Sequence, residues 1–305
     1  MALEDHLLTE SPNPDSERLD QLSATEFVAL MNLEDLKAVH AVQAEATSIA
    51  RAIEVIADRF QKGGRLIYVG AGTSGRLGVL DASECPPTFN SPPGMVVGLI
   101  AGGPTALTRA VEGAEDDRGR GGLEIEEIGT SESDVVVGIA TSGRTPYVLG
   151  AIESAKNRGA FTIGLACNRP SLLGEVVDLE IAPLVGPEVL AGSTRLKSGT
   201  ATKLVLNMLT TGAMVLIGKT LGNRMVDLQP TNEKLRIRTR RILRELAGID
   251  DNEAARLLEA CSGQLKPALV AAMAGVDPST AADLLKRHGG QVRQAVAGAI
   301  SDDHI

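Results

Sequence analysis

The chain has 305 residues, 43% of them hydrophobic, and a formal net charge of −9. This length supports one large core with a smaller second domain, because single cores stop growing at roughly 250–300 residues. The acidic balance, the lack of Trp and the presence of only two Tyr and four Phe exclude the basic, stacking surface that nucleic-acid binding usually needs.

The first part of the chain is expected to form a helical arm, residues 1–50. Residues 1–34 are polar and interrupted by prolines, so only short helical pieces are predicted there. Apolar residues then recur at helical spacing from about Leu36 to Phe60. This pattern predicts one helix, which Gly63 ends.

Strand-like and helical segments alternate in the middle of the chain. The β-rich runs are 65–69, 95–100, 134–140, 161–166 and, more weakly, 178–181. The helical segments between them are 76–84, 104–117, 146–158 and 171–176. Such alternation predicts an α/β fold, a doubly wound parallel sheet of about five strands flanked by helices. Val135–Ala140 is apolar apart from one Gly, as expected for a strand that is buried on both faces.

The last part of the chain is predicted to be entirely helical. Residues 195–220 read as one long, mostly buried helix, and no strand pattern follows Pro230. The pattern of residues 254–264 recurs at 281–291, and two copies of a helix–Gly–helix unit predict a small bundle, because a solenoid needs about three repeats. Such a bundle could dock or dimerise, or it could only stabilise the chain.

The predicted domains are therefore the arm 1–50, an α/β domain 51–228 and an all-helical C-terminal domain 229–305. One basic run, 236–244, lies in the last of these. We interpret it as the solvated face of a helix and not as a track for a nucleic-acid backbone.

The first strand is followed by a glycine-rich turn that carries hydroxyl groups. Gly70–Gly75 matches the dinucleotide fingerprint G-x-G-x-x-G, but the second strand ends without the carboxylate that would hold a ribose. Gly72, Thr73 and Ser74 instead offer hydroxyls and backbone N–H groups at the start of a helix. This combination suits a terminal phosphate.

The third strand is followed by a second turn of the same kind, Thr141–Thr145, with Pro146 where a helix would begin. Ser142 and Thr145 flank Gly143 and can both donate to a phosphate. Ser and Thr at such positions are most often plain helix N-caps. Two turns of one type, at the strand ends where ligands of open α/β sheets bind, favour an anion site.

Two acidic blocks are candidates for acid–base chemistry. Glu84 precedes Cys85-Pro86-Pro87, and the residue before a proline disfavours helix, so the helix is expected to stop near Cys85. Glu84 would then lie in the last turn, where the helix dipole disfavours a negative charge and a dry site would keep the carboxyl protonated. Glu115 lies in a crowded acidic run, in which protonation of one carboxylate is favoured. Spacing alone selects neither residue.

Other kinds of site find no support in the sequence. The histidines lie away from these turns, so a Ser-His-Asp arrangement is not expected, and no cluster has metal-ligand spacing. The three cysteines, Cys85, Cys167 and Cys261, are far apart and odd in number, which favours a reducing compartment. Without a signal-peptide pattern or a run of about 18 apolar residues, we expect a soluble, cytoplasmic protein with no membrane contact.

The motifs together resemble the N-acetylmuramic acid 6-phosphate etherase family, whose members have a sugar-isomerase (SIS) type domain. The blocks that carry the resemblance are 70–78, 81–89, 110–116, 142–148 and 192–207. Met31–Asp35 and the helical C-terminus are similar too, so the resemblance covers nearly the whole chain. Thr141 departs from the pattern, at a position where Ala would serve equally.

The resemblance implies an activity and its catalytic groups. Members of the family are cofactor-free lyases that cleave the ether between sugar C3 and D-lactate, giving N-acetylglucosamine 6-phosphate, in the recycling of peptidoglycan. Glu84 is implied to be the proton donor and Glu115 the other acid/base.

The resemblance also implies how the substrate is held. The 6-phosphate would be bound by Ser74, Ser142 and Thr145 within the two turns. Ser193 and Lys197 belong to a block that reaches the site from the same or the other subunit. A homodimer with sites near the subunit interface is implied as well.

Two other functions remain open. The family is also similar to an animal regulatory protein that binds fructose phosphates without catalysis, so the fold alone does not establish chemistry. A sugar-phosphate sensor of this kind would need the turns but neither Glu. An aldose–ketose isomerase of the same fold would exchange the C2 proton without releasing lactate, although no nearby His is evident for ring opening.

Overall fold

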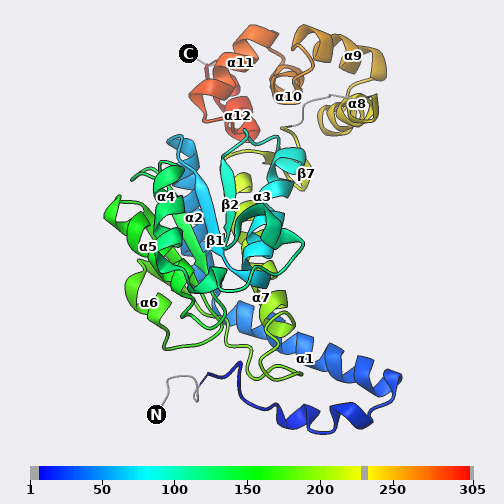
Figure 1. The fold of residues 1–305 in the computed structure, drawn as a ribbon. Coiled ribbons are helices and arrows are strands. Elements are labelled where there is room, and N and C mark those ends of the chain that lie inside the picture. Colours follow the sequence, from blue (N-terminus) through cyan, green and yellow to red (C-terminus); the bar gives the residue numbers. More distant parts are fainter. Residues whose placement is uncertain (1–6, 228–232, 303–305) are drawn as a thin grey trace. The chain divides into compact units, whose positions relative to one another are not determined.

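The computed structural model describes residues 7–227 and 233–302. Within that range the chain forms two compact units (Figure 1). Of the described residues, the first consists of 7–83 and 94–211, and the second of 84–93, 212–227 and 233–302. The described part of the predicted arm, 7–50, therefore belongs to the first unit, whereas 212–227 and the short piece 84–93 group with the C-terminal helices.

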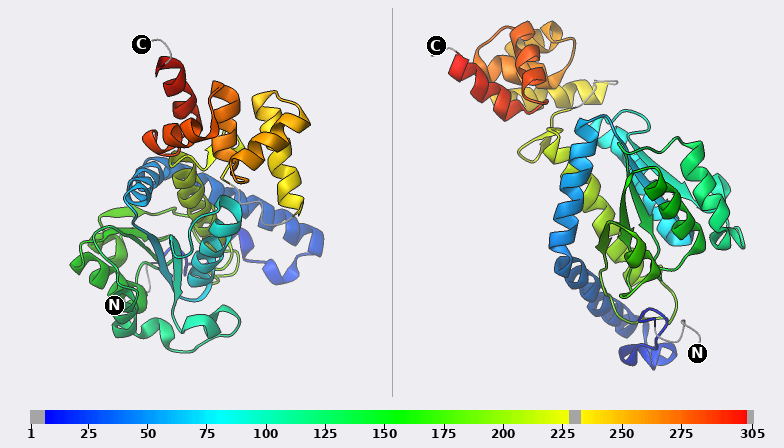
Figure 2. Two further views of the ribbon diagram at one scale, coloured as in Figure 1. Left: turned by 90° about the horizontal axis from the view of Figure 1, so that it is seen from above. Right: turned by 90° about the vertical axis from the view of Figure 1, so that its left-hand side faces the viewer.

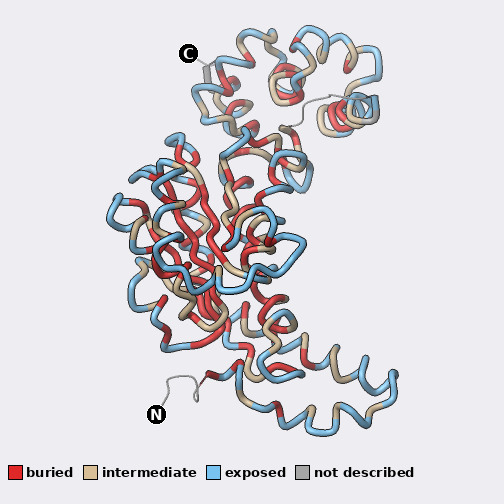
Figure 3. The backbone as a smooth tube through the Cα atoms, in the orientation of Figure 1, coloured by how far each residue is buried: buried red, intermediate tan, exposed pale blue. Residues whose placement is uncertain are grey.

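The first unit is built on a five-stranded parallel sheet, in the order β2-β1-β3-β4-β5. The strands are β1 Leu66–Gly70, β2 Val96–Ile100, β3 Val135–Ile139, β4 Phe161–Leu165 and β5 Leu179–Ile181. The predicted parallel sheet is confirmed. Every residue of β1 and β3 is buried, as Figure 3 shows along the central strands, because both faces of an apolar strand need a covering layer.

Helices cover both faces of this sheet. They are α2 Ala46–Gln61, α3 Gly72–Phe89, α4 Arg118–Glu127, α5 Pro146–Asn157, α6 Leu172–Val176 and α7 Lys197–Leu216. Ile67 and Val136 pack in one buried cluster with Ile125 of α4 and Ile152 of α5. Figure 2 shows α2 and α7 on the opposite side of the sheet from α4 and α5. The doubly wound arrangement is thus the predicted one.

The region before the sheet differs from the prediction of one helix over 36–60. It holds two helices, α1 Ala24–Ala44 and α2, which meet at Glu45. The earlier start has a local cause: Ser23 accepts a hydrogen bond from the Glu26 N–H, and the Glu26 carboxylate accepts one from the Ser23 N–H. This capping box fixes the N-terminus of α1.

The predicted helix over 104–117 is also wrong. The segment contains two 3-10 turns, η4 Gly103–Leu107 and η5 Ala114–Asp116, and the helix of this region is α4. Gly113, inside this segment, adopts a left-handed φ of 73°, which a continuous α-helix does not contain.

The second unit contains a short hairpin and a helical bundle. Its elements are β6 Thr220–Leu221, β7 Arg224–Met225, α8 Glu233–Ala247, α9 Asp251–Ala260, α10 Leu265–Ala274, α11 Pro278–Arg287 and α12 Val292–Asp302. The sequence repeat corresponds to α9–α10 and α11–α12. Ala254 and Ala281, which correspond in the two copies, are both fully buried in one core. Within the described residues no single helix is long and apolar enough to cross a membrane, and only the bent pair α10 and α11 meets those criteria jointly.

Candidate functional site

The first predicted phosphate turn links β1 to α3. Gly72 is the first residue of α3, so Thr73 and Ser74 lie in the first turn of this helix. The first hydrogen bond of the helix runs from the Gly75 N–H to the Ala71 carbonyl, at 3.1 Å. The N–H groups of Gly72, Thr73 and Ser74 precede the first intrahelical bond, so they point out of the helix end. Thr73 and Ser74 are half-buried beside them. The turn therefore presents backbone and hydroxyl donors together.

The glycine fingerprint in this turn has a packing explanation. A Cβ atom on Gly75 would lie 2.7 Å from the Gly70 carbonyl oxygen and 2.6 Å from Ile100 Cγ1. Glycine at this position therefore lets α3 approach the strands closely, the role of the last glycine in such fingerprints. This packing role explains the match to G-x-G-x-x-G without a bound dinucleotide.

The second turn links β3 to α5 and is equally tight. Gly143 has a φ of 69°, and a Cβ atom there would lie 2.4 Å from Ser171 Cβ. Ser142 Oγ accepts a hydrogen bond from the Arg144 N–H at 3.3 Å. Thr145 is the N-cap of α5, yet its side chain makes no capping hydrogen bond. The plain N-cap interpretation therefore does not account for the Thr145 hydroxyl.

The two turns lie side by side. β1 and β3 are neighbouring parallel strands, with Gly70 in register with Ile139, and both turns follow directly. Paired strands are about 4.8 Å apart, so the turns share one stretch of the carboxyl edge. One phosphate group is small enough to contact both. The ligand contacts themselves stay a prediction.

Arg144 is a residue of this edge that the sequence analysis missed. Its Nη1 atom is buried and makes no hydrogen bond with the described part of the chain. A buried guanidinium N–H without an acceptor is costly. The only signal in the sequence was a basic residue inside a Ser/Thr-rich turn.

A third segment, the start of α7, lies beside the first turn. A Cβ atom on Gly199 would lie 3.7 Å from Thr73 Cγ2, an ordinary contact distance. Ser193 is half-buried in the loop that leads into α7, and its N–H donates to the Leu190 carbonyl at 2.9 Å. The predicted block therefore reaches the first turn within one chain.

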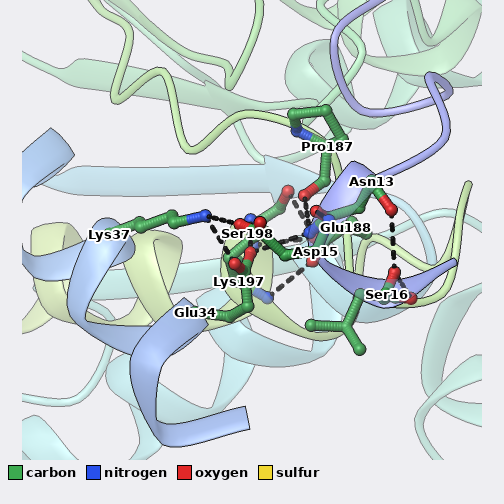
Figure 4. A network of polar contacts seen from close by, with 10 residues as sticks. Asn13, Asp15, Ser16, Glu34, Lys37, Pro187, Glu188, Lys197 and Ser198 are labelled. Atoms are coloured by element: carbon green, nitrogen blue, oxygen red, sulfur yellow. Dashed lines mark hydrogen bonds and ion pairs between the residues drawn. The ribbon is translucent and has the colours of Figure 1, made fainter. Parts of the chain in front are cut away.

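The Lys197 side chain is buried against the protein. Its ammonium group pairs with the Glu34 carboxylate of α1, and the two side chains are only 1% and 2% exposed (Figure 4). Burial opposes ionisation of Glu34, but hydrogen bonds from Lys197, Lys37 and Asn13 outweigh it and hold the pKa of this carboxyl below its usual value. In this arrangement Lys197 pairs with Glu34, and its predicted contact with the substrate stays a prediction.

Asp81 is the buried acid of the block that contains Glu84. It accepts hydrogen bonds from Tyr68 Oη at 2.9 Å and from Asn207 Nδ2 at 2.7 Å. These contacts join β1, α3 and α7 on one face of the sheet. We assign Asp81 a structural role, because its carboxylate oxygens are occupied inside the core.

Glu84 lies on α3, which is longer than predicted. The helix continues through Pro86 and Pro87 to Phe89, so the expected stop near Cys85 is wrong. Cys85 and Phe89 are both buried, four residues apart on one face, and this packing outweighs the local preference of a residue before proline. Glu84 is exposed within the helix and not in its last turn. The dipole argument for a protonated Glu84 therefore fails, and its catalytic role stays a prediction.

Glu115 lies in η5, between the second strand and α4, and is exposed together with its acidic neighbours. It belongs to the first unit, as both turns do, whereas Glu84 groups with the second unit. Its role as an acid/base also stays a prediction.

Comparison with known proteins identifies the family. The N-acetylmuramic acid 6-phosphate etherase of Rhodopirellula baltica is 59% identical over 264 residues, which make up 87% of each chain. Etherases of the same name from Nostoc sp. and Pasteurella multocida are 57% and 53% identical over 87% of this chain and 86% and 88% of theirs. This chain belongs to the N-acetylmuramic acid 6-phosphate etherase family.

The domain comparisons agree with the fold. A model of the glucokinase regulatory protein N-terminal SIS domain matches residues 48–156 of this etherase-family chain, and a SIS domain model matches 129–212. A phosphoheptose isomerase from Francisella tularensis superposes with a TM-score of 0.51 at 18% identity, over 64% of this chain and 100% of that one. This likeness supports the SIS fold alone.

Groups suited to a metal are not found near the turns. Across residues 7–227 and 233–302, no set of three or more His, Cys, Asp or Glu side chains could hold a metal ion. The predicted absence of a cofactor in this family member stays a prediction.

Proposed function

We propose that this protein is an N-acetylmuramic acid 6-phosphate etherase, which releases D-lactate from its substrate and leaves N-acetylglucosamine 6-phosphate. The observation that carries the proposal is the 59% identity to a named etherase over 87% of both chains. Glu84 and Glu115 both lie in motifs of the family.

The 6-phosphate is held by the two turns of the sheet edge. Ser74 of the first turn and Ser142 and Thr145 of the second donate their hydroxyls, and Gly72, Thr73, Thr141 and Gly143 contribute the surrounding backbone. Arg144 supports this assignment, because a phosphate oxygen would accept the hydrogen bond that its buried Nη1 lacks. Ser193 belongs to the loop that completes the site next to the first turn.

The chemistry begins with the open-chain sugar, whose C1 aldehyde acidifies the proton on C2. A carboxylate removes this proton, the C2–C3 double bond forms, and the C3–O bond breaks as the lactate oxygen receives a proton. Water then adds, its oxygen to C3 and a proton to C2. The sum is substrate plus water to N-acetylglucosamine 6-phosphate plus D-lactate.

The two glutamates divide the proton transfers. Glu84 protonates the departing lactate oxygen, and Glu115 acts as the other acid/base. Each such transfer contributes about 10²–10⁴-fold. The phosphate contacts position C2 and C3 toward these groups and so add an orientation effect.

The active form is a homodimer with its sites near the subunit interface. Support comes from α1, where Val28, Leu33, Leu36 and Val39 are exposed. Leu36 and Val39 lie opposite Glu34 on the helix, and Val28 and Leu33 lie on its flanks, because a helix has 3.6 residues per turn. We place the reaction in the cytoplasm, in the recycling of amino sugars from peptidoglycan.

The direct test is release of D-lactate from N-acetylmuramic acid 6-phosphate by the purified protein. Glu84→Gln should lower the rate at least 100-fold while binding of the product sugar phosphate persists. Glu54→Gln, on the exposed face of α2, is the matched control and should keep full activity. Normal lactate release by the Glu84 variant would refute its assigned role.

One alternative has an observation in its favour. The match to the glucokinase regulatory protein SIS domain over 48–156 fits a sugar-phosphate sensor without turnover. Reaction in D₂O separates the possibilities: the etherase gives lactate and a product with deuterium at C2, an isomerase gives exchange at C2 without lactate, and a sensor gives neither.

A further inference from the structure

We propose that Glu34 and Lys197 are positioning residues, which hold the first phosphate turn in place through the start of α7. The inference rests on the proposed role of that turn in binding a sugar phosphate. The proposal gives α1 and the segment before it a part in the site, although the proposed ligand contacts come from other segments.

The first step is the burial of the ion pair. Lys197 and Glu34 lie far apart in sequence, and their paired side chains are almost completely shielded from solvent (Figure 4). Asn13 Nδ2 also donates to Glu34, at 2.9 Å, and to the Pro187 carbonyl at 3.2 Å. Asn13, in the segment before α1, therefore links the Glu34 carboxylate of α1 to the loop before α7.

The second step is a second carboxylate at the same helix end. Glu188 accepts hydrogen bonds from the N–H groups of Lys197 and Ser198, both at 2.9 Å, and from Ser198 Oγ at 2.8 Å. Glu188 is itself fully buried. The first turn of α7 is thus fixed by side-chain contacts to Glu34 and by backbone contacts to Glu188.

The third step leads from α7 to the phosphate turn. Gly199 is buried one residue after Ser198, and a Cβ atom added to it would lie 3.7 Å from Thr73 Cγ2, so the start of α7 lies beside Thr73. Thr73 and the neighbouring Ser74 supply donors of the turn. A displacement of the first turn of α7 therefore changes the position of these donors.

Energetics suggest why an ion pair is used here. A well-packed apolar pair of similar volume is often as stable as a buried ion pair, so stability alone does not require these charges. A charged pair with further hydrogen bonds fixes a definite geometry. That geometry is what a phosphate site needs, because misplacement by about 1 Å can cost up to about 100-fold.

The test compares two ion pairs in the same protein, each with a buried carboxylate. Glu34→Leu/Lys197→Met replaces the proposed positioning pair by apolar groups. Asp134→Asn is the control: Asp134 is buried and pairs with Arg65 at 2.8 Å, next to the amino ends of β1 and β3 and so away from the turns. Stability of each variant is followed by denaturant unfolding, and KM and kcat by lactate release.

We expect KM to rise on the order of tenfold in the double variant, with kcat changed less than about threefold. Asp134→Asn should lower stability and leave KM unchanged. A folded double variant with the KM of the unchanged protein would overturn the proposal, and so would an equal rise of KM in the control.

Two further measurements keep the proposal testable. If the double variant does not fold, Ser198→Ala, which removes the hydroxyl contacts to Glu188 and Cys167 but keeps the backbone contact, should still raise KM about two- to threefold, and an unchanged KM would refute the proposal. If the protein releases no lactate at all, the proposed function fails, but binding of N-acetylglucosamine 6-phosphate by calorimetry still decides the positioning role by the same comparison.

Discussion

The guanidinium of Arg144 has a buried N–H group for which the described residues provide no hydrogen-bond acceptor. Its buried Nη1 lacks an acceptor among the described residues, whereas Ser142 in the same turn already accepts the Arg144 N–H. Proteins rarely leave such a group unpaired, and exceptions often mark function. In the proposed function Arg144 binds the phosphate, a role that charge and position in the sequence did not distinguish from that of a surface arginine.

Replacement of Arg144 by Met should weaken binding of the sugar phosphate without lowering the stability of the fold. Loss of a charge-assisted contact to the phosphate should raise KM for the sugar phosphate at least tenfold. The free energy of unfolding should stay the same or rise by about 1 kcal/mol, because an unsatisfied buried group is removed. Steady-state kinetics and urea unfolding measure the two effects.

Arg118→Met is the control for this substitution. Arg118 is exposed and pairs with Glu153 at 2.9 Å, away from the turns, so its loss should change neither quantity appreciably. A destabilised Arg144→Met protein with an unchanged KM would show that Arg144 serves the fold instead.

Glu34 predicts a pH dependence of stability. Its pKa in the folded protein is lowered: burial raises it, but the hydrogen bonds from Lys197, Lys37 and Asn13 lower it by more. A lowered folded pKa adds stability that is complete above the unfolded pKa, about 4.3, and is lost as the pH falls through the folded pKa. The Glu34 contribution is therefore present at pH 7 and disappears under acid conditions.

Urea unfolding between pH 7 and pH 3 measures this contribution. Glu34→Gln should be less stable than the unchanged protein at pH 7, and the difference should shrink as the pH falls below about 4. Asp134 also has a lowered pKa: burial raises it, but the hydrogen bonds from Arg65 and Ser131 lower it by more, so both proteins should still lose some stability in acid. A stability difference that is constant over this range would contradict the ionised state of Glu34.

At the scale of elements, α3 shows tertiary packing overriding a local rule. Pro86 and Pro87 lie inside the helix, and neither can donate a backbone hydrogen bond. Burial of Cys85 and Phe89 compensates for this cost. No pattern of prolines and glycines could reveal that compensation, because it depends on which neighbours cover the helix face.

Pro86→Ala tests how much Pro86 destabilises α3. The substitution restores a helical N–H and should raise the free energy of unfolding by about 1 kcal/mol or more, although the freer unfolded chain offsets part of the gain. Thermal or urea unfolding measures it. A lower stability of the variant would mean that the proline fits the helix without strain.

The predictability of the elements follows from the strength of each signal. The five strands were predictable, because short apolar runs bounded by glycines have few other interpretations. Helix α4 was missed, since its sequence contains three glycines among ten residues and an acidic, weakly apolar pattern. The two turns were predictable from their Gly and Ser/Thr residues, whereas their adjacency follows from the observed pairing of β1 with β3. The Glu34–Lys197 contact joins distant segments and left no periodic signal.

At the scale of the whole molecule, α1 carries the argument for self-association. Glu34, Ala38 and Val42 form its buried face, yet Val28, Leu33, Leu36 and Val39 are exposed on the flanks and the opposite side, with Leu33 64% exposed. A helix that is apolar around its circumference is usually buried, so α1 needs a second covering surface. In our proposal a second copy of the chain supplies it.

Light scattering and paired substitutions test this arrangement. The unchanged protein should have twice the 31.8 kDa mass of the chain, and Leu33→Asp/Leu36→Asp should have the mass of one chain. Charges buried at an interface without partners are costly enough to separate the copies. Leu123→Asp, at an exposed position of α4, should stay dimeric. Because the sites are proposed to lie near the interface, lactate release should fall with the dimer, and a 31.8 kDa species of full activity would exclude both the interface on α1 and its part in the site.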